Sequence, residues 1–280
     1  MTFSVATPSP RRLYRAILEA NEEPSPGYRL LRYRLDAPLA FRAGQFAMLR
    51  GDWAADPLLA RPMSILRTND EGDRAEFLLK VVGHGTALLC DARPGARATV
   101  LAPLGRPFPR DLDAARAALL VGGGVGVPPV FALARELAGA GRAAQTVLFL
   151  GGRSAPDTFP ALAREVRALG IEVVVATEDG SAGFAARVTV PLAPRLADAA
   201  AAPGGATLYA CGPDGMLRAL AGLARDCGGP AGPVRYLAAV EQLMACGFGA
   251  CLGCVLECAD GNRRLVCSEG PVLDGRLVYG

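Results

Sequence analysis

Cysteine is concentrated near the end of the chain. Cys246, Cys251 and Cys254 form a C-x4-C-x2-C motif, and Cys267 follows after twelve intervening residues. This is the ligand spacing of plant-type [2Fe-2S] clusters, in which a tight loop wraps one side of the cluster and a later cysteine completes the set. A four-cysteine zinc site is the alternative, but such sites usually present two C-x2-C-type pairs. The spacing therefore favours a [2Fe-2S] cluster over zinc.

The residues around these cysteines fit a cluster. Three glycines lie between the ligands, namely Gly247, Gly249 and Gly253. Without a Cβ, they let backbone N–H groups turn toward the sulfurs. We interpret Cys258 as a bystander, and we expect Cys90 and Cys227 to be small core residues. Clustering of this kind among 8 cysteines indicates metal binding in a reducing compartment, the cytoplasm, and not a disulfide framework.

A glycine-rich turn is the second chemical signal. The stretch Val121-Gly-Gly-Gly-Val-Gly-Val-Pro-Pro129 follows an apolar run and opens a helical pattern. That geometry places backbone N–H groups and a helix N-terminus against a pyrophosphate. The glycines of this G-x-G-x-x-G variant are Gly122, Gly123, Gly124 and Gly126. We expect a nicotinamide dinucleotide here, and Arg153 after the next apolar run leaves both NAD and NADP open.

A second turn follows the fourth apolar run of the same half. Its residues are Cys211, Gly212 and Pro213. They stand at the carboxyl edge of the expected sheet, which is where open α/β sheets bind ligands. The alternative is a turn that only opens the next helix.

The N-terminal half offers a candidate phosphate and flavin site. Arg61-Pro-Met-Ser64 precedes Lys80 and the stretch Gly83-His-Gly-Thr86. An arginine held in place by the following proline can bind phosphate through two N–H groups, and a hydroxyl can hydrogen-bond to the edge of a flavin. Glycines let a dinucleotide approach the backbone. Alone, these segments would be an ordinary strand end and turn. His84 is the only histidine, so neither a Ser-His-Asp triad nor a histidine metal site is expected.

Two kinds of element must position these residues. From about Leu13 to Pro109, short apolar runs alternate with polar residues between Gly and Pro, as in a small antiparallel barrel. After Asp111 the pattern becomes apolar run, glycine turn and helix, which predicts a parallel sheet covered on both faces. The expected strands and helices are Ala117–Val121, Val130–Ala140, Thr146–Leu150, Ala161–Leu169, Ile171–Val175, Thr207–Ala210 and Met216–Asp226. Gly228–Pro233 is interpreted as a linker before the cysteine tail.

Composition excludes several classes of protein. With 280 residues and 51% hydrophobic content, the chain can bury an ordinary core. A net charge of +3, spread without basic runs, leaves no nucleic-acid footprint. No stretch approaches a membrane span, and we expect neither a membrane nor a nucleic acid as partner.

Taken in order, these motifs resemble the ferredoxin-reductase superfamily. Glu241-Gln-Leu-Met-Ala-Cys-Gly-Phe-Gly-Ala-Cys-Leu-Gly-Cys254 and Val266-Cys-Ser-Glu-Gly-Pro-Val272 narrow the resemblance to the electron transfer subunits of class 1B dihydroorotate dehydrogenases. It spans about Arg12 to Val278. Leu243 stands where that family often has a basic residue, and His84 where lysine is common.

The resemblance implies three parts and their cofactors. These are an FAD-binding antiparallel β-barrel over residues 1–111, an NAD-binding α/β domain over 112–232 and a small [2Fe-2S] domain over 233–280. The positions that match FAD contacts are Arg61, Pro62, Met63, Ser64, Leu78, Leu79, Lys80, Gly85 and Thr86. The four cysteines match the cluster ligands, and Thr177–Ser181 resembles a family loop. No general acid or base is predicted, and Cys211 would lie beside the flavin and nicotinamide rings.

The implied role is electron transfer in pyrimidine biosynthesis. An FMN-containing catalytic subunit would oxidise dihydroorotate and form a hetero-oligomer, a heterotetramer, with this chain. Electrons would pass through the cluster and FAD to NAD+. One alternative is the diaphorase subunit of a ferredoxin:NADP oxidoreductase or sulfide dehydrogenase complex. A non-enzymatic adaptor stapled by zinc is the alternative of another class.

Overall fold

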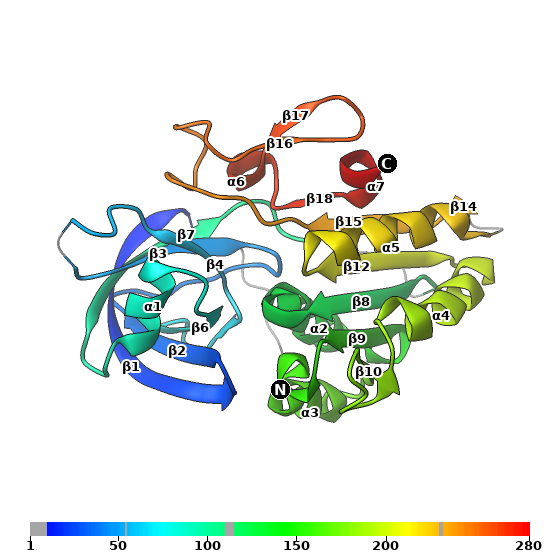
Figure 1. Cartoon of the computed structure of the whole chain (residues 1–280), viewed down its shortest axis with the longest axis horizontal. Coiled ribbons are helices and arrows are strands. Elements are labelled where there is room, and N and C mark those ends of the chain that lie inside the picture. The colour runs from blue at the N-terminus through cyan, green and yellow to red at the C-terminus, as the bar shows by residue number, and fades with distance from the viewer. Residues whose placement is uncertain (1–9, 54, 110–114, 230–231) are drawn as a thin grey trace.

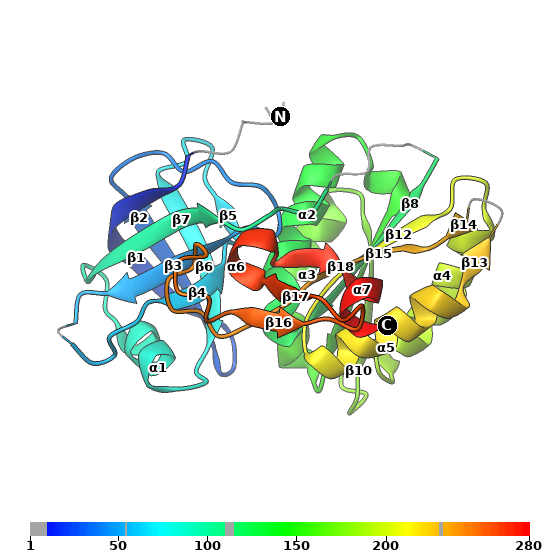
Figure 2. The same cartoon turned by 90° about the horizontal axis from the view of Figure 1, so that it is seen from above.

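Two large sheets stand side by side in the computed structural model (Figure 1). The structure describes residues 10–53, 55–109, 115–229 and 232–280. The boundary expected at 111/112 and the middle of the expected linker, 230–231, lie outside these ranges. The cysteine tail crosses above both sheets (Figures 1 and 2).

The first sheet is antiparallel and curled. Its strands, in the order β4-β3-β7-β1-β2-β6-β5, are β1 (Arg12–Ser25), β2 (Tyr28–Leu35), β3 (Phe46–Gly51), β4 (Arg61–Ser64), β5 (Arg67–Thr68), β6 (Arg74–Lys80) and β7 (Arg97–Leu104). Alternate residues of β1, such as Tyr14, Ala16 and Leu18, are buried, as a strand with one core face requires. The curl brings β4 into contact with β6.

One element of this half differs from the prediction. Helix α1 (His84–Asp91) follows β6, where only strands and turns were expected. The sequence pattern that would predict this helix is weak, because the helix spans eight residues and begins in the glycine-containing turn.

The second sheet has the predicted parallel architecture. Its order is β11-β10-β9-β8-β12-β15-β18, and only β18 runs antiparallel to its neighbour. The strands are β8 (Ala117–Gly123), β9 (Thr146–Gly152), β10 (Glu172–Thr177), β11 (Phe184–Ala185), β12 (Ala206–Cys211), β15 (Arg235–Ala239) and β18 (Val272–Asp274). The fold class predicted from the sequence is confirmed.

Helices cover both faces of this sheet. The helices are α2 (Val127–Gly139), α3 (Pro160–Ala168), α4 (Thr189–Ala201) and α5 (Asp214–Asp226), with 3-10 turns η1 (Gly124–Gly126), η2 (Ala143–Gln145) and η3 (Ala155–Thr158). Apolar residues of α2 and α3 share one core, and those of α4 and α5 share another. Burial on both faces explains why the central strands are continuously apolar.

The tail adds strands to the second sheet and a loop over the first. Its elements are β15, β16 (Val255–Glu257), β17 (Arg263–Leu265), α6 (Val266–Glu269), β18 and α7 (Gly275–Tyr279). The segment expected to be a linker instead forms a short antiparallel pair, β13 (Gly228–Gly229) with β14 (Gly232–Pro233). Because β15 and β18 pair with each other and β15 pairs with β12, both ends of the cysteine segment are anchored. In the described part of the chain, no helix has the length and hydropathy to cross a membrane.

Candidate functional site

The tail brings the four predicted cluster cysteines together in two pairs. Cys246 interacts with Cys251, and Cys267 with Cys254. Cys254 and Cys267 are buried, whereas Cys251 is exposed. Among the residues that the structure describes, no three His, Cys, Asp or Glu side chains converge as a site for one metal ion. Two thiol pairs are the donor set that a cluster of two irons and four cysteines needs.

Backbone N–H groups point at these sulfurs. The N–H groups of Phe248 and Gly253 donate to Cys246 Sγ and Cys251 Sγ at 3.5 and 3.4 Å. The N–H of Cys267 donates to Cys254 Sγ at 3.4 Å. Hydrogen bonds of this kind stabilise negative charge on sulfur and tune the potential of an iron–sulfur centre. The residues present therefore fit a [2Fe-2S] cluster.

The two pairs differ in their electrostatics. At Cys246, burial opposes ionisation, but N–H groups such as that of Phe248 outweigh it and lower the thiol pKa to about 6. At Cys267, burial and then the neighbouring Cys254 raise the pKa to about 12. The thiolate is the form that binds iron, so Cys246 is prepared for ligation by its own loop.

Glycine lets this loop pack directly on the curled sheet. Gly247 has φ +80°, and a Cβ there would lie 2.5 Å from Met48 Cγ and 3.2 Å from Leu104 Cδ1. Met48 is in β3 and Leu104 ends β7, so the cysteine loop rests on the same sheet that carries Arg61. A larger residue at this position would push the loop away from the sheet.

Two of the segments predicted to bind flavin come together where the curl of the first sheet brings β4 near β6. Arg61 of β4 lies over the start of α1, because a Cβ on Gly85 would be only 2.3 Å from the Arg61 Nε atom. Thr86 Oγ1 accepts from the N–H of Val82 at 2.9 Å and from that of Gly83 at 3.1 Å, which closes the turn. Leu78, Leu79 and Lys80 end β6, the strand that β4 contacts. The Arg61 guanidinium thus covers the buried Gly85, and a guanidinium is suited to bind phosphate.

The glycine turn and the Cys211 turn meet at the carboxyl edge of the parallel sheet. Gly122 and Gly123 end β8, and Gly124 to Gly126 form η1 before α2. A Cβ on Gly126 would lie 2.3 Å from the carbonyl oxygen of Cys211 and 2.5 Å from Gly212 N. A Cβ on Gly123 would likewise lie 3.0 Å from Pro213 Cδ. These turns were predicted separately, and the structure brings them into one site.

Burial controls the chemistry of Cys211. Its side chain is 2% exposed, and burial raises the thiol pKa well above 9.0. A neutral thiol can contribute to the shape and polarity of the site, but it is a poor nucleophile. Outside this site, Cys90 and Cys258 are buried and Cys227 is half-buried. His84 is exposed and lies 3.6 Å from Asp56.

Comparison with known proteins identifies the family. Residues 241–279 match the iron-sulfur cluster binding domain of dihydroorotate dehydrogenase B, and residues 120–221 match an oxidoreductase NAD-binding domain. The chain is 42% identical over 234 residues to the dihydroorotate dehydrogenase B (NAD(+)) electron transfer subunit of Geobacillus thermodenitrificans, covering 82% of this chain and 83% of that one. The chain belongs to the dihydroorotate dehydrogenase B electron transfer subunits. The resemblance inferred from its motifs is confirmed.

Other relatives of this family agree. The electron transfer subunit of Listeria monocytogenes is 36% identical over 239 residues, which cover 82% of this chain and 84% of that protein. This chain is therefore an oxidoreductase subunit that contains an NAD-binding domain and an iron–sulfur cluster-binding domain.

Solved structures support the fold of the dihydroorotate dehydrogenase B subunit. An NADH-dependent reduced ferredoxin-NADP oxidoreductase superposes with a TM-score of 0.77 at 24% identity, covering 94% of this chain and 89% of the other. The ferredoxin reductase of carbazole 1,9a-dioxygenase gives 0.67 at 21% identity, covering 79% and 68%. At these identities the likeness concerns the fold alone.

Sequence reasoning did not find one polar contact at this site. The Tyr28 hydroxyl donates to Asp157 Oδ1 at 2.6 Å, although the residues are 129 positions apart. Tyr28 begins β2 of the curled sheet, and Asp157 lies in η3 after β9. Asp157 caps η3 in a local Ser154–Asp157 capping box, but no local pattern relates it to Tyr28, so only the fold could place the two residues together.

Proposed function

We propose that this electron transfer subunit carries FAD on the curled sheet and a [2Fe-2S] cluster in the cysteine loop, and exchanges electrons with NAD at the glycine turn. The observation that carries the proposal is the contact of the Cys246–Cys254 loop with β3 and β7, next to the strand that holds Arg61. It supports a cluster and a flavin held on neighbouring parts of one sheet.

Each set of side chains has a holding role in this proposal. Cys246, Cys251, Cys254 and Cys267 would bind the irons, while the N–H groups of Phe248, Gly253 and Cys267 stabilise charge on sulfur. The FAD positions would be Arg61, Pro62, Met63, Ser64, Leu78, Leu79, Lys80, Gly85 and Thr86. The NAD positions would be Gly122, Gly123, Gly124, Gly126, Cys211, Gly212 and Pro213. We propose 1–111, 112–232 and 233–280 as the corresponding regions.

The bound groups would supply the redox chemistry. Nicotinamide moves hydride pairs, an iron–sulfur cluster moves single electrons, and flavin does both. The chain itself would orient the dinucleotides through backbone N–H groups and exclude water with buried side chains such as Cys211. It needs no general acid or base for these tasks.

An apolar surface beside the cluster loop supports a partner subunit. Leu243, Phe248 and Leu252 are 86%, 43% and 60% exposed around the ligand cysteines. Clustered exposed apolar residues mark interaction sites. We propose that the FMN-containing catalytic subunit docks here in a heterotetramer. We also propose a reducing, cytoplasmic setting, because four of the eight cysteines would bind iron and none of the eight forms a disulfide in the described structure.

The test begins with the isolated protein and its metal content. We expect a brown protein containing FAD and two irons, whose absorption changes on addition of NADH. Replacing Cys251 with Ser should remove iron, whereas Cys258→Ser, a neighbouring buried cysteine outside the ligand set, should keep it. A colourless protein that contains zinc instead would overturn the proposal.

The second step identifies the electron donor. Combined anaerobically with an FMN-containing dihydroorotate dehydrogenase subunit, the wild-type chain should couple dihydroorotate oxidation to NAD+ reduction. Coupling only to ferredoxin or sulfide would instead indicate a diaphorase subunit of another complex.

A further inference from the structure

One hydrogen bond joins the two sheets beside the glycine turn. The Tyr28 hydroxyl, 2.6 Å from Asp157 Oδ1, belongs to the curled sheet, and Asp157 belongs to the nucleotide-binding half. Tyr28 is 3% exposed. It meets Phe159 edge to face with a centroid distance of 4.7 Å. A buried side chain with both a packed ring and a bonded hydroxyl holds a single orientation.

Asp157 is itself fixed to the nucleotide-binding half. Its Oδ2 atom accepts from the N–H groups of Arg153 and Ser154 at 3.1 and 3.3 Å. These residues follow β9, the strand next to β8 and its glycine turn. Burial and then the bond to Asp157 raise the pKa of Tyr28, so the hydroxyl stays protonated and remains the donor.

Tyr28 also contacts both candidate cofactor regions. Lys80, opposite Tyr28 in the β2–β6 ladder, places Nζ 3.5 Å from the hydroxyl and 4.9 Å from the ring centroid. A Cβ added to Gly124 would lie 3.8 Å from the same hydroxyl oxygen. The side chain therefore stands between the end of β6 and the first residue of η1.

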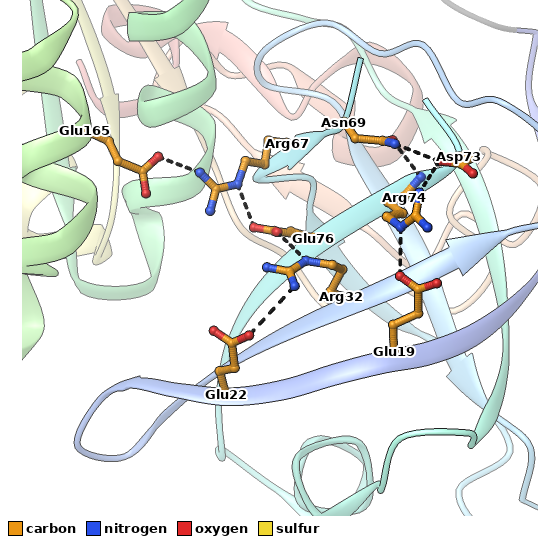
Figure 3. Close-up of polar contacts among 9 residues, drawn as sticks. All are labelled: Glu19, Glu22, Arg32, Arg67, Asn69, Asp73, Arg74, Glu76 and Glu165. Atoms are coloured by element: carbon orange, nitrogen blue, oxygen red, sulfur yellow. Dashed lines mark hydrogen bonds and ion pairs between the residues drawn. The ribbon is translucent and has the colours of Figure 1, made fainter. Parts of the chain in front are cut away.

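Among the described residues, two further polar contacts between the curled sheet and the helices of the other half lie elsewhere. Glu136, in the last turn of α2, accepts from Ala43 N at 2.6 Å. Arg67 pairs with Glu165 on α3 at 2.5 Å (Figure 3). Both contacts lie away from the glycine turn, because Glu136 is at the opposite end of α2 and Glu165 is on α3. Of these three contacts, the Tyr28–Asp157 bond is the one next to the turn.

We propose that Tyr28, bonded to Asp157, is a positioning residue for hydride transfer between nicotinamide and flavin. The inference rests on the proposed function, in which the two dinucleotides are held by different halves of the chain. Their reacting rings then meet only if the halves keep one relative position. A displacement of about 1 Å between reacting groups can reduce a rate about 100-fold.

The test compares two tyrosines of the same strand in the complete holoprotein. Tyr28→Phe removes the hydroxyl and keeps the ring. Tyr33→Phe is the matched control, because Tyr33 is 1% exposed and packs inside the curled sheet against Phe77. In single-turnover reduction by NADH at saturation, we expect Tyr28→Phe to slow flavin reduction about 10- to 100-fold. The NADH dissociation constant, FAD content and iron content should stay near wild type.

A second set of variants separates positioning from loss of structure. Asp157→Ala should slow flavin reduction like Tyr28→Phe, and the double variant should be no slower than Asp157→Ala alone, as expected for residues acting through one contact. Reduction by dithionite should proceed at the same rate in all variants. With NADH deuterated at the transferred position, the isotope effect should grow in Tyr28→Phe because hydride transfer becomes limiting.

Two outcomes would overturn the inference. One is a wild-type rate of flavin reduction in Tyr28→Phe, and the other is an equal slowing in Tyr33→Phe. If the flavin of the wild-type protein is not reduced by NADH at all, the proposed function fails instead, whatever Tyr28 does.

Discussion

Arg67 of β5 lies 2.5 Å from Glu165 of α3, and this ion pair joins the curled sheet to the nucleotide-binding half (Figure 3). Arg67 also donates to Glu76 at 2.6 Å, and Glu76 accepts from Arg32 at 2.8 Å. The side chain of Glu76 is 10% exposed, whereas that of Glu165 is 45% exposed. Arg67 thus has one buried and one exposed partner, and the two ion pairs should contribute different amounts to the free energy of unfolding.

Removing the exposed partner should cost little. We expect Glu165→Gln to lower the free energy of unfolding by about 0.2–1 kcal/mol, because solvent screens the pair. Arg67→Met should cost about 1–3 kcal/mol, since it also deprives the buried Glu76 of a charged donor. Urea unfolding measures both values. Glu257→Gln, in a pair with both side chains 74% exposed, is the control and should change nothing. Equal losses of unfolding free energy in Glu165→Gln and Arg67→Met would show that the buried partner of Arg67 adds nothing to the exposed one.

Gly126 should be intolerant of a side chain. A Cβ there would lie 2.3 Å from the Cys211 carbonyl oxygen, so the glycine turn and the Cys211 turn would have to separate. We expect Gly126→Ala to cost about 1–3 kcal/mol of stability, as overpacking does. It should also raise the NADH concentration at half-maximal flavin reduction about tenfold, or about 1.4 kcal/mol.

Gly222 provides the matched control for this variant. It lies inside α5, and a Cβ there would meet only Arg225 Nη2 at 3.8 Å. Gly222→Ala should leave NADH binding unchanged and stabilise the helix by about 0.5–1 kcal/mol. Unchanged NADH binding in Gly126→Ala would show that the glycine turn is not the dinucleotide site.

The sequence predicted the nucleotide-binding half well because its signals are local. Continuous apolar runs before glycine turns marked β8, β9, β10 and β12 to within a few residues. Helix α2 begins at Val127, before the predicted start at Val130, because proline in the first turn of a helix loses no hydrogen bond. Helix α4 was not predicted, since Pro191 and Pro194 interrupt its pattern.

Contacts between distant residues set the limit of sequence reasoning. The cysteine spacing indicated one loop, but not that Gly247 would rest on Met48 of β3. Arg61 and Gly85 were assigned to one candidate flavin site, but only the fold shows that the guanidinium lies over this glycine. The Ser154–Asp157 capping box could be recognised from the sequence, but nothing local to Asp157 or to Tyr28, a tyrosine at the start of a strand, indicates that the two side chains meet.

Stability should fall in alkaline solution because of Cys211. Burial raises its pKa in the folded state well above 9.0, so the unfolded chain loses this proton first as the pH rises. The folded state is therefore favoured fully below about pH 9 and progressively less above it. Thermal unfolding at several pH values should show a shallower alkaline loss in Cys211→Ala than in the wild type.

Alkylation gives an independent readout of the same thiol. Folded protein should leave Cys211 unmodified by iodoacetamide at about pH 8, because a neutral buried thiol is unreactive. Cys227, which is half-buried, should react earlier. Modification of Cys211 before Cys227, detected by mass spectrometry, would contradict the burial of this site.

A charge at Leu243 should weaken assembly without affecting the NADH reaction. Leu243 is 86% exposed beside the cluster loop, and burying a new carboxylate in an apolar interface is costly. We expect Leu243→Asp to raise the dissociation constant for the FMN subunit about 10-fold or more, while NADH still reduces the bound flavin normally. Val190→Asp, at a 60% exposed position on α4, is the control. Equal weakening by Leu243→Asp and Val190→Asp would show that the surface around Leu243 is not where the FMN subunit docks.

Gly85 should control flavin binding through Arg61 without controlling the fold. A Cβ on Gly85 would lie 2.3 Å from Arg61 Nε and 2.5 Å from Arg61 Cζ, and a flexible guanidinium can move away from it. Gly85→Ala should therefore displace Arg61 and leave the free energy of unfolding of the flavin-free protein near wild type. If Arg61 holds FAD phosphate, the loss of about 1.5–3 kcal/mol from a charged hydrogen bond weakens FAD binding about 10- to 100-fold. Gly222→Ala on α5, where a Cβ would meet only Arg225 Nη2 at 3.8 Å, should bind FAD like the wild type. Fluorescence titration of the flavin-free proteins measures both affinities, and wild-type affinity in Gly85→Ala would exclude Arg61 as a phosphate ligand.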